Sequence, residues 1–154
     1  MLIEQAQDLK IQLIETAILA LNDRISNAEK AMKDAQDSAN QEEKSSAGDK
    51  YETGRAMGQL QRDMNAKQSI LAKKELAYLQ QLSTSPKNQV GTGALVKTNN
   101  GIYFISIGLG SIDSAIGKVH LVSAESPIGK AMQELQINSE FKFNELSHTI
   151  EFIA

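Results

Sequence analysis

Residues 11–39 read IQLIETAILALNDRISNAEKAMKDAQDSA, and this stretch decides how the first half of the chain folds. Its apolar residues recur at alternating spacings of three and four: Ile11, Ile14, Ile18, Leu21, Ile25, Ala28, Met32, Ala35 and Ala39. A helix with this spacing places them on one stripe, as a heptad coiled coil does. The stretch therefore predicts a long helix that packs one face against a partner helix.

A second apolar series continues the same register further along the chain: Met57, Leu60, Met64, Leu71, Tyr78 and Leu82, with Lys67 and Lys74 at intervening seam positions. Between the two series, Gly48 suits the end of a first helix and Asp49 suits the N-cap of a second. The simplest prediction is a long antiparallel helical hairpin over residues 1–82, with its acidic tip near residues 45–52. At 1.5 Å per residue the second arm would be ~50 Å long.

The composition changes near residue 83. Seven of the ten glycines and both prolines follow this point, whereas the first part is rich in good helix formers. Residues 83–90 are polar, include a proline and predict a linker. Residues 91–154 alternate apolar and polar side chains, and they predict strands over 93–98, 102–107, 117–122, 141–143 and 149–153, an irregular loop from 108 to 111, and a short helix capped by Ser126. The predicted class is α+β, with a small antiparallel sheet after the hairpin.

Charge and residue content exclude several functions. The chain has 154 residues with 16 basic and 19 acidic side chains, so its net charge of −3 does not favour free binding to duplex DNA. It has no Cys, no Trp and two His, which disfavours Cys-ligated metals, disulfides and a ring-walled cofactor pocket. We expect His120 and His148 to be structural. Without a signal-like N-terminus or a long apolar run, we expect a cytoplasmic protein that does not enter a membrane.

The most informative side chains for chemistry lie at the predicted tip. Asp49 and Glu52 are three residues apart on one helical turn, so the two carboxylates can share a divalent cation. The same pair also fits a capping box at a helix N-terminus, and both interpretations stay open. Arg55 and Arg62 are seven apart and share a helix face, where they can contact phosphates or pair with neighbours such as Glu52.

Two motifs resemble those of a known family. Residues 126–132 (SPIGKAM) are similar to the Ser-Pro-Ile/Leu-x-x-Ala-Leu signature of the Gre transcript-cleavage factors, GreA and GreB, of bacterial RNA polymerase. Residues 48–53 (GDKYET) keep the Gly, Asp and Glu of that family's tip motif at the same spacing. The chain also resembles the family in length and domain order, which implies an FKBP-like fold for residues 91–154.

The resemblance implies a transcription elongation factor that acts on the polymerase. The hairpin would enter the secondary channel, where Asp49 and Glu52 help to hold a Mg²⁺ shared with the polymerase active site. The polymerase would then cleave backtracked nascent RNA, and Glu125, Ser126 and Pro127 would touch the channel rim. On this view the chain is a monomeric accessory factor, not an enzyme, and has no cofactor of its own.

Three alternatives belong beside this hypothesis. Residues 53–56 (TGRA) replace the family's Asn-Ala-Glu-Tyr, so a channel-binding regulator that does not cleave RNA is the first alternative. An FKBP-like chaperone or prolyl isomerase is the second, although the scarcity of aromatic residues argues against an isomerase pocket. A coiled-coil adaptor that dimerises through its seam is the third.

Overall fold

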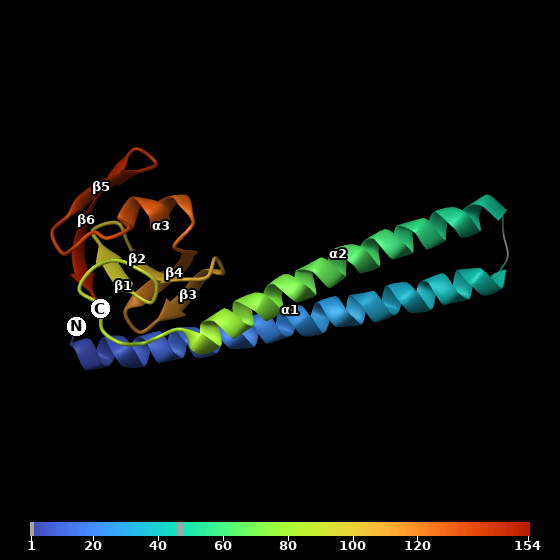
Figure 1. The fold of residues 1–154 in the computed structure, drawn as a ribbon, viewed down its shortest axis with the longest axis horizontal. Coiled ribbons are helices and arrows are strands. Elements are labelled where there is room, and N and C mark those ends of the chain that lie inside the picture. Colours follow the sequence, from blue (N-terminus) through green and yellow to red (C-terminus); the bar gives the residue numbers. More distant parts are fainter. Residues whose placement is uncertain (1, 46–47) are drawn as a thin grey trace. The chain divides into compact units, whose positions relative to one another are not determined.

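The computed structural model describes residues 2–45 and 48–154, with the side chains of residues 42–51 left undescribed. Its elements are α1 (Ile3–Ser45), α2 (Gly48–Gln81), β1 (Leu95–Thr98), β2 (Gly101–Ser106), β3 (Gly110–Ser114), β4 (Gly117–Ser123), α3 (Pro127–Met132), β5 (Glu140–Phe143) and β6 (Leu146–Ile153) (Figure 1). Two long helices are thus followed by a sheet with one short helix, which confirms the α+β class. None of the described helices has both the length and the apolar character needed to cross a bilayer.

The chain packs as two compact units. Leu19–Ala77 forms one of them, which we call the hairpin unit. Met1–Ile18 and Tyr78–Ala154 form the other, which we call the sheet unit. Both long helices therefore contribute to both units.

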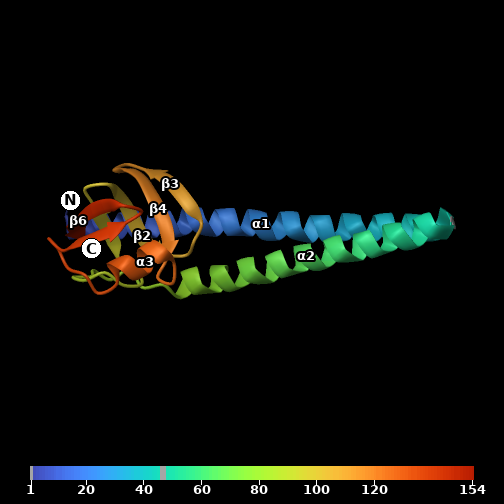
Figure 2. The same cartoon turned by 90° about the horizontal axis from the view of Figure 1, so that it is seen from above.

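In the hairpin unit, α1 and α2 run side by side in opposite directions (Figures 1 and 2). Lys73 Nζ lies 3.1 Å from Glu29 Oε1, and Arg62 Nη1 donates to Gln36 Oε1 over 3.1 Å. Partners that lie later on α1 thus pair with residues that lie earlier on α2. The predicted antiparallel helical hairpin is confirmed in this unit.

The predicted seam of α1 is confirmed in its middle and wrong at its start. Leu21 and Ala28 are buried, but Ile11 is 44% exposed. A different stripe is buried in the first turns: Ala6, Leu9, Lys10, Leu13 and Ala17. This part of α1 belongs to the sheet unit, so its buried face is the one that the sheet unit covers.

The predicted seam of α2 is wrong. In the hairpin unit its large apolar residues are exposed, from 57% for Met64 and Leu71 to 66% for Met57, while in the sheet unit Tyr78 is 40% exposed and Leu82 is half-buried. The residues of α2 that are buried or half-buried in the hairpin unit are mainly small or polar: Gly54, Gly58, Arg62, Asn65, Ala66, Ser69, Ala72, Glu75 and Leu76. A Cβ added to Gly58 would lie 3.7 Å from the carbonyl oxygen of Ala35, so the two backbones approach closely there. Small residues permit that approach, and Met or Leu would hold the helices apart.

The sheet has six strands in the order β3-β4-β2-β1-β6-β5. Four of its pairings are antiparallel, but β2 and β4 are parallel, with Tyr103 opposite His120. The predicted all-antiparallel sheet is therefore wrong at this pair. The cause is β3, which begins in the predicted loop at Gly110 and takes the edge next to β4, so that β4 returns parallel to β2.

Two further pairs of consecutive strands form hairpins. β1 and β2 join through Asn99 and Asn100, with Thr98 opposite Gly101. β5 and β6 join through Asn144 and Glu145, whose φ angles of 51° and 65° are typical of the turns that match the twist of a two-residue hairpin. The predicted closing strand pair is therefore confirmed.

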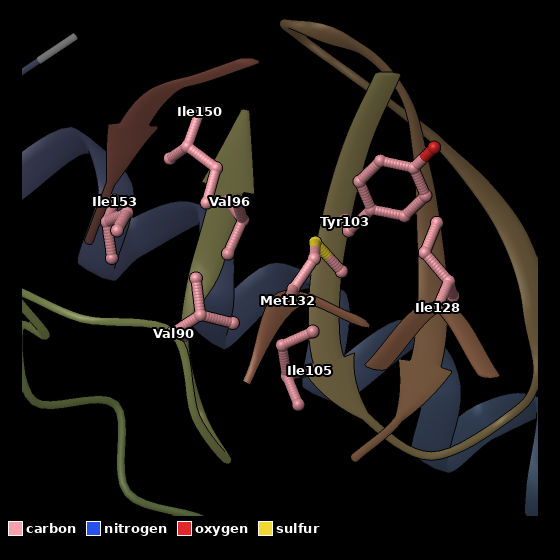
Figure 3. Close-up of a cluster of buried hydrophobic side chains, with 9 residues drawn as sticks. Val90, Val96, Tyr103, Ile105, Ile128, Met132, Ile150 and Ile153 are labelled. Carbon is pink, nitrogen blue, oxygen red and sulfur yellow. The ribbon is translucent and has the colours of Figure 1, made fainter. Parts of the chain in front are cut away.

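Both faces of the sheet are covered within the sheet unit. The side that carries α3 holds the main apolar cluster (Figure 3): Val90, Ala94, Val96, Tyr103, Ile105, Ile128, Met132, Ile150 and Ile153. The first turns of α1 lie behind the strands in that view. Gln5 of α1 lines a hollow together with Ile102 and Phe152, which places α1 against the opposite face.

Candidate functional site

The predicted acidic tip falls where α2 begins. α2 is described from Gly48 onward, and the Asp49 side chain, on which the predicted N-cap depends, lies outside the described residues. Positions 49 and 52 are three apart in one helix and share a side of it. The side chain of Glu52 is exposed to solvent.

Metal ligands do not gather elsewhere in the described part of the chain. Among the side chains of residues 2–41 and 52–154, no three His, Asp or Glu residues form a group that could hold a metal ion. The predicted role of Asp49 and Glu52 in holding a shared cation stays a prediction.

Arg55 and Arg62 line one small hollow between α1 and α2. The hollow has a volume of about 140 Å³ and includes Ala35 and Gly58 in its wall. Arg62 is held in place by its hydrogen bond to Gln36 and lies 3.9 Å from Asp63. The shared helix face predicted from their spacing is thus present, and their contact with RNA stays a prediction.

The Ser126 cap of α3 is confirmed in detail. Ser126 Oγ accepts a hydrogen bond from the backbone N–H of Gly129 over 3.1 Å and donates to the carbonyl of Ser123 over 2.7 Å. Pro127 occupies the first turn, where a missing N–H costs nothing. A Cβ on Gly129 would collide with the Ser123 carbonyl oxygen, so the glycine in this motif is required by packing.

The same cap leaves two of the three predicted docking residues accessible. Glu125 and Pro127 are exposed, whereas Ser126 is half-buried and its hydroxyl is used within the loop. Ile128 and Met132, on the other side of α3, are buried in the apolar cluster. The helix therefore anchors a rigid exposed corner, and its role in docking stays a prediction.

The two histidines flank Tyr103 on the α3 side of the sheet. The His148 ring is buried, stacks on Phe141 at 4.8 Å between centroids, and lies with Nδ1 3.3 Å from Thr98 Oγ1 in a hydrogen bond. The His120 ring lies 5.5 Å from that of Tyr103. Burial raises the pKa of the Tyr103 phenol. His148 is therefore part of the core and His120 is half-buried beside Tyr103, which agrees with the prediction that both are structural.

Sequence reasoning missed Lys10, which is fully buried on α1. Its Nζ donates to the carbonyl of Ser85 over 3.2 Å. Burial, together with the smaller effect of the nearby Lys87 charge, lowers the Lys10 pKa from 10.5 to about 8. The sequence signal that could have indicated this burial is the spacing of Ala6, Lys10, Leu13 and Ala17, which places the lysine on an apolar stripe of the helix.

Comparison with known proteins gives a likeness to solved structures and none to family models or curated proteins. Among solved structures, the chain is similar to the crystal structure of GreA factor homolog 1 (Gfh1) protein of Thermus thermophilus. That alignment covers 97% of this chain and 94% of the other, with 12% identity and a TM-score of 0.34. At those values the likeness assigns no family to this chain.

Proposed function

We propose that this chain binds bacterial RNA polymerase and inserts the turn of its helical hairpin into the secondary channel, where it stimulates cleavage of backtracked RNA. The α3 corner carries this proposal. Residues 126–132 combine a Ser126 cap, a packing-required Gly129 and buried apolar residues, and leave Glu125 and Pro127 exposed for the rim. This is the motif through which the sequence resembles the Gre factors.

The hairpin supplies the second part of the proposal. α1 and α2 are antiparallel, and positions 49 and 52 lie in the first turns of α2, at the end of the hairpin unit where α1 ends. Glu52 is exposed and therefore accessible to a cation outside the chain. An elongated support that ends in carboxylates suits delivery of these groups into a narrow channel.

The donor chemistry fits a shared Mg²⁺. Asp49 and Glu52 provide carboxylate oxygens, which Mg²⁺ prefers, but two carboxylates do not complete an octahedral shell. The polymerase carboxylates and the RNA phosphate would supply the remaining ligands. When bound, such a cation activates water and stabilises the charge that develops on the cleaved phosphodiester. The chain itself contributes orientation: one helical turn fixes the spacing of its two carboxylates.

The test is RNA 3′-end cleavage in a stalled, backtracked elongation complex. We expect the wild type to accelerate cleavage, and Asp49→Asn/Glu52→Gln to lose that effect while still binding the polymerase. Asp23→Asn/Glu15→Gln is the matched control, because it removes the same charge from two exposed positions of α1. Binding without cleavage by the wild type would instead assign the non-cleaving regulator, and absence of binding would refute both.

A further inference from the structure

The outer side of α2 in the hairpin unit carries an apolar stripe, which we define as Met57, Leu60, Met64 and Leu71. These side chains are 57–66% exposed. Their spacing continues through Lys67 and Lys74, so that one helix face alternates large apolar groups with two ammonium groups. Contiguous exposed apolar surface on a folded protein marks an interaction site.

Two residues of the stripe, Met57 and Leu71, line hollows between α1 and α2 in the hairpin unit. One hollow, of about 480 Å³, has Ala35, Ala39 and Gly58 in its lining and Met57 at its wall. A second, of about 450 Å³, is lined by residues that include Ala28, Ala72 and Leu71. Met57 and Leu71 are nearly four helical turns apart, so both hollows open on the same side of α2. We call the two together the hairpin groove.

A buried carboxylate in the groove also lacks a partner. Glu75 lines the second hollow, and its Oε2 atom is buried without a hydrogen-bond partner among the described residues. Leaving such an oxygen unsatisfied is costly, so this position favours an occupant that supplies an N–H or O–H donor.

The lysines argue against a second copy of this chain as the occupant. In a parallel pair of stripes, Lys67 would meet Lys67 and Lys74 would meet Lys74. In an antiparallel pair centred on Met64, Lys67 would face Gln61 and Lys74 would face Gly54, and neither of these residues is a carboxylate. An ammonium group buried in a helix interface needs an opposite charge.

We propose that the hairpin groove binds an amphipathic helix of a partner protein, with apolar side chains against the stripe and carboxylates facing Lys67 and Lys74. Helices of this kind dock in grooves through residues spaced by three and four, and methionines adapt to such surfaces. A hydrogen-bond donor on the same helix would satisfy Glu75. The proposal goes beyond polymerase binding and does not depend on it.

The test uses the full chain and a synthetic amphipathic peptide of about 21 residues, three heptads long. The peptide carries Leu at seam positions, Glu facing Lys67 and Lys74, and Gln facing Glu75, and its binding is followed by fluorescence anisotropy. Leu71→Glu is the test variant. Ile70→Glu is its matched control, because Ile70 is 56% exposed against 57% for Leu71 but lies off the stripe.

We expect saturable binding that Leu71→Glu weakens at least about tenfold, since the loss of one buried leucine is worth that factor or more. Ile70→Glu should stay within about twofold of the wild type. Lys67→Glu/Lys74→Glu should no longer bind the acidic peptide, and it should bind a peptide in which Lys replaces those Glu residues. An unfolded variant would bind neither peptide.

Three results would overturn the proposal. They are the absence of saturable binding by the wild type, an equal loss in the Ile70 and Leu71 variants, and indifference of the lysine variant to the charge of the peptide. Sedimentation provides the remaining check, because a dimer of the wild type that Leu71→Glu abolishes would make a second copy the occupant. Circular dichroism of each variant confirms that the hairpin is intact.

Discussion

Lys10 is a charged group at a position where the fold would accept an apolar one. Its Nζ has one hydrogen bond, to the Ser85 carbonyl, and its pKa falls from 10.5 to about 8. The unfolded chain therefore holds this proton more tightly than the folded chain does. Stability contributed by Lys10 is lowest below pH 8 and rises as the pH increases from about 8 to 10.5.

We expect Lys10→Met to raise the free energy of unfolding at pH 7 by about 1–2 kcal/mol. The substitution keeps the volume and removes the cost of burying a charge, and the exposed Ser85 segment can bind water in place of the lost hydrogen bond. Urea unfolding of both proteins between pH 7 and pH 10 measures the effect. The advantage of the variant should shrink above pH 8, and a constant difference across this range would contradict the assignment.

Gly129 and Gly91 form a matched pair of glycines with opposite environments. A Cβ at Gly129 would collide with the Ser123 carbonyl oxygen, whereas a Cβ at Gly91 would meet nothing within 4 Å. We expect Gly129→Ala to lower the free energy of unfolding by about 2–3 kcal/mol, and Gly91→Ala to change it by less than about 0.5 kcal/mol. Thermal unfolding measures the stability of the two variants. If Gly129→Ala lost as little stability as is expected of Gly91→Ala, the α3 corner would not require its glycine.

At the scale of elements, α2 shows the limit of heptad patterns. Met57 and Leu71 follow the spacing of a seam, yet the helix turns Gly58 and Ser69 inward. Periodicity shows that a stripe exists, but it does not show which stripe meets the other helix. That choice depends on the Ala residues of α1, which favour a close approach by small side chains.

Gly58 tests how tight that approach is. Its added Cβ would lie 3.7 Å from the Ala35 carbonyl oxygen and 4.0 Å from Ala39 Cβ, which are ordinary contacts. Gly58→Ala should therefore stabilise the hairpin by about 0.5–1 kcal/mol through helix propensity. Gly58→Leu should destabilise it, because the longer side chain would force the helices apart. Far-UV circular dichroism during urea unfolding distinguishes the two, and destabilisation by alanine would mean a closer contact than this.

In the sheet unit, too, features that depend on residues close in sequence could be predicted, whereas a pairing of strands that depends on distant residues could not. The Asn99-Asn100 turn and the Ser126 cap could be predicted, because each depends on residues within a few positions. The parallel pairing of β2 with β4 could not, because it depends on β3, which begins after a glycine-rich loop without a strong alternating pattern.

At the scale of the whole molecule, the sheet unit is built from both ends of the described chain. Leu13 of α1 is 1% exposed and belongs to this unit, whereas Leu19, six residues later, is 68% exposed. We expect Leu13→Asp to lower the free energy of unfolding of the sheet unit by about 4 kcal/mol, and Leu19→Asp to leave it nearly unchanged.

Amide NMR signals from β1 and β2 provide the measurement, because they report on the strands and not on the substituted helix. Loss of their dispersion in the Leu13 variant alone is the expected outcome. If both variants kept well-dispersed strand signals, the start of α1 would not be needed for the sheet.

The candidate site was predictable to a similar degree. Ser126 and the shared face of Arg55 and Arg62 followed from short-range spacing, and the structure places them as expected. Lys10 was missed because a single lysine on an apolar stripe is normally expected to reach solvent. The hairpin groove could not be predicted, because it exists only once the inward face of α2 is known.

The two-ended construction of the sheet unit also bears on biosynthesis. During translation, the Leu13 side of α1 leaves the ribosome long before β6, which pairs with β1 and supplies Phe152 to the face of the sheet that α1 covers. The nascent chain can close its helical hairpin early, but one buried surface of α1 waits uncovered until the last strand emerges. In that interval the growing polypeptide exposes apolar surface, which is the condition under which nascent chains aggregate or need a chaperone.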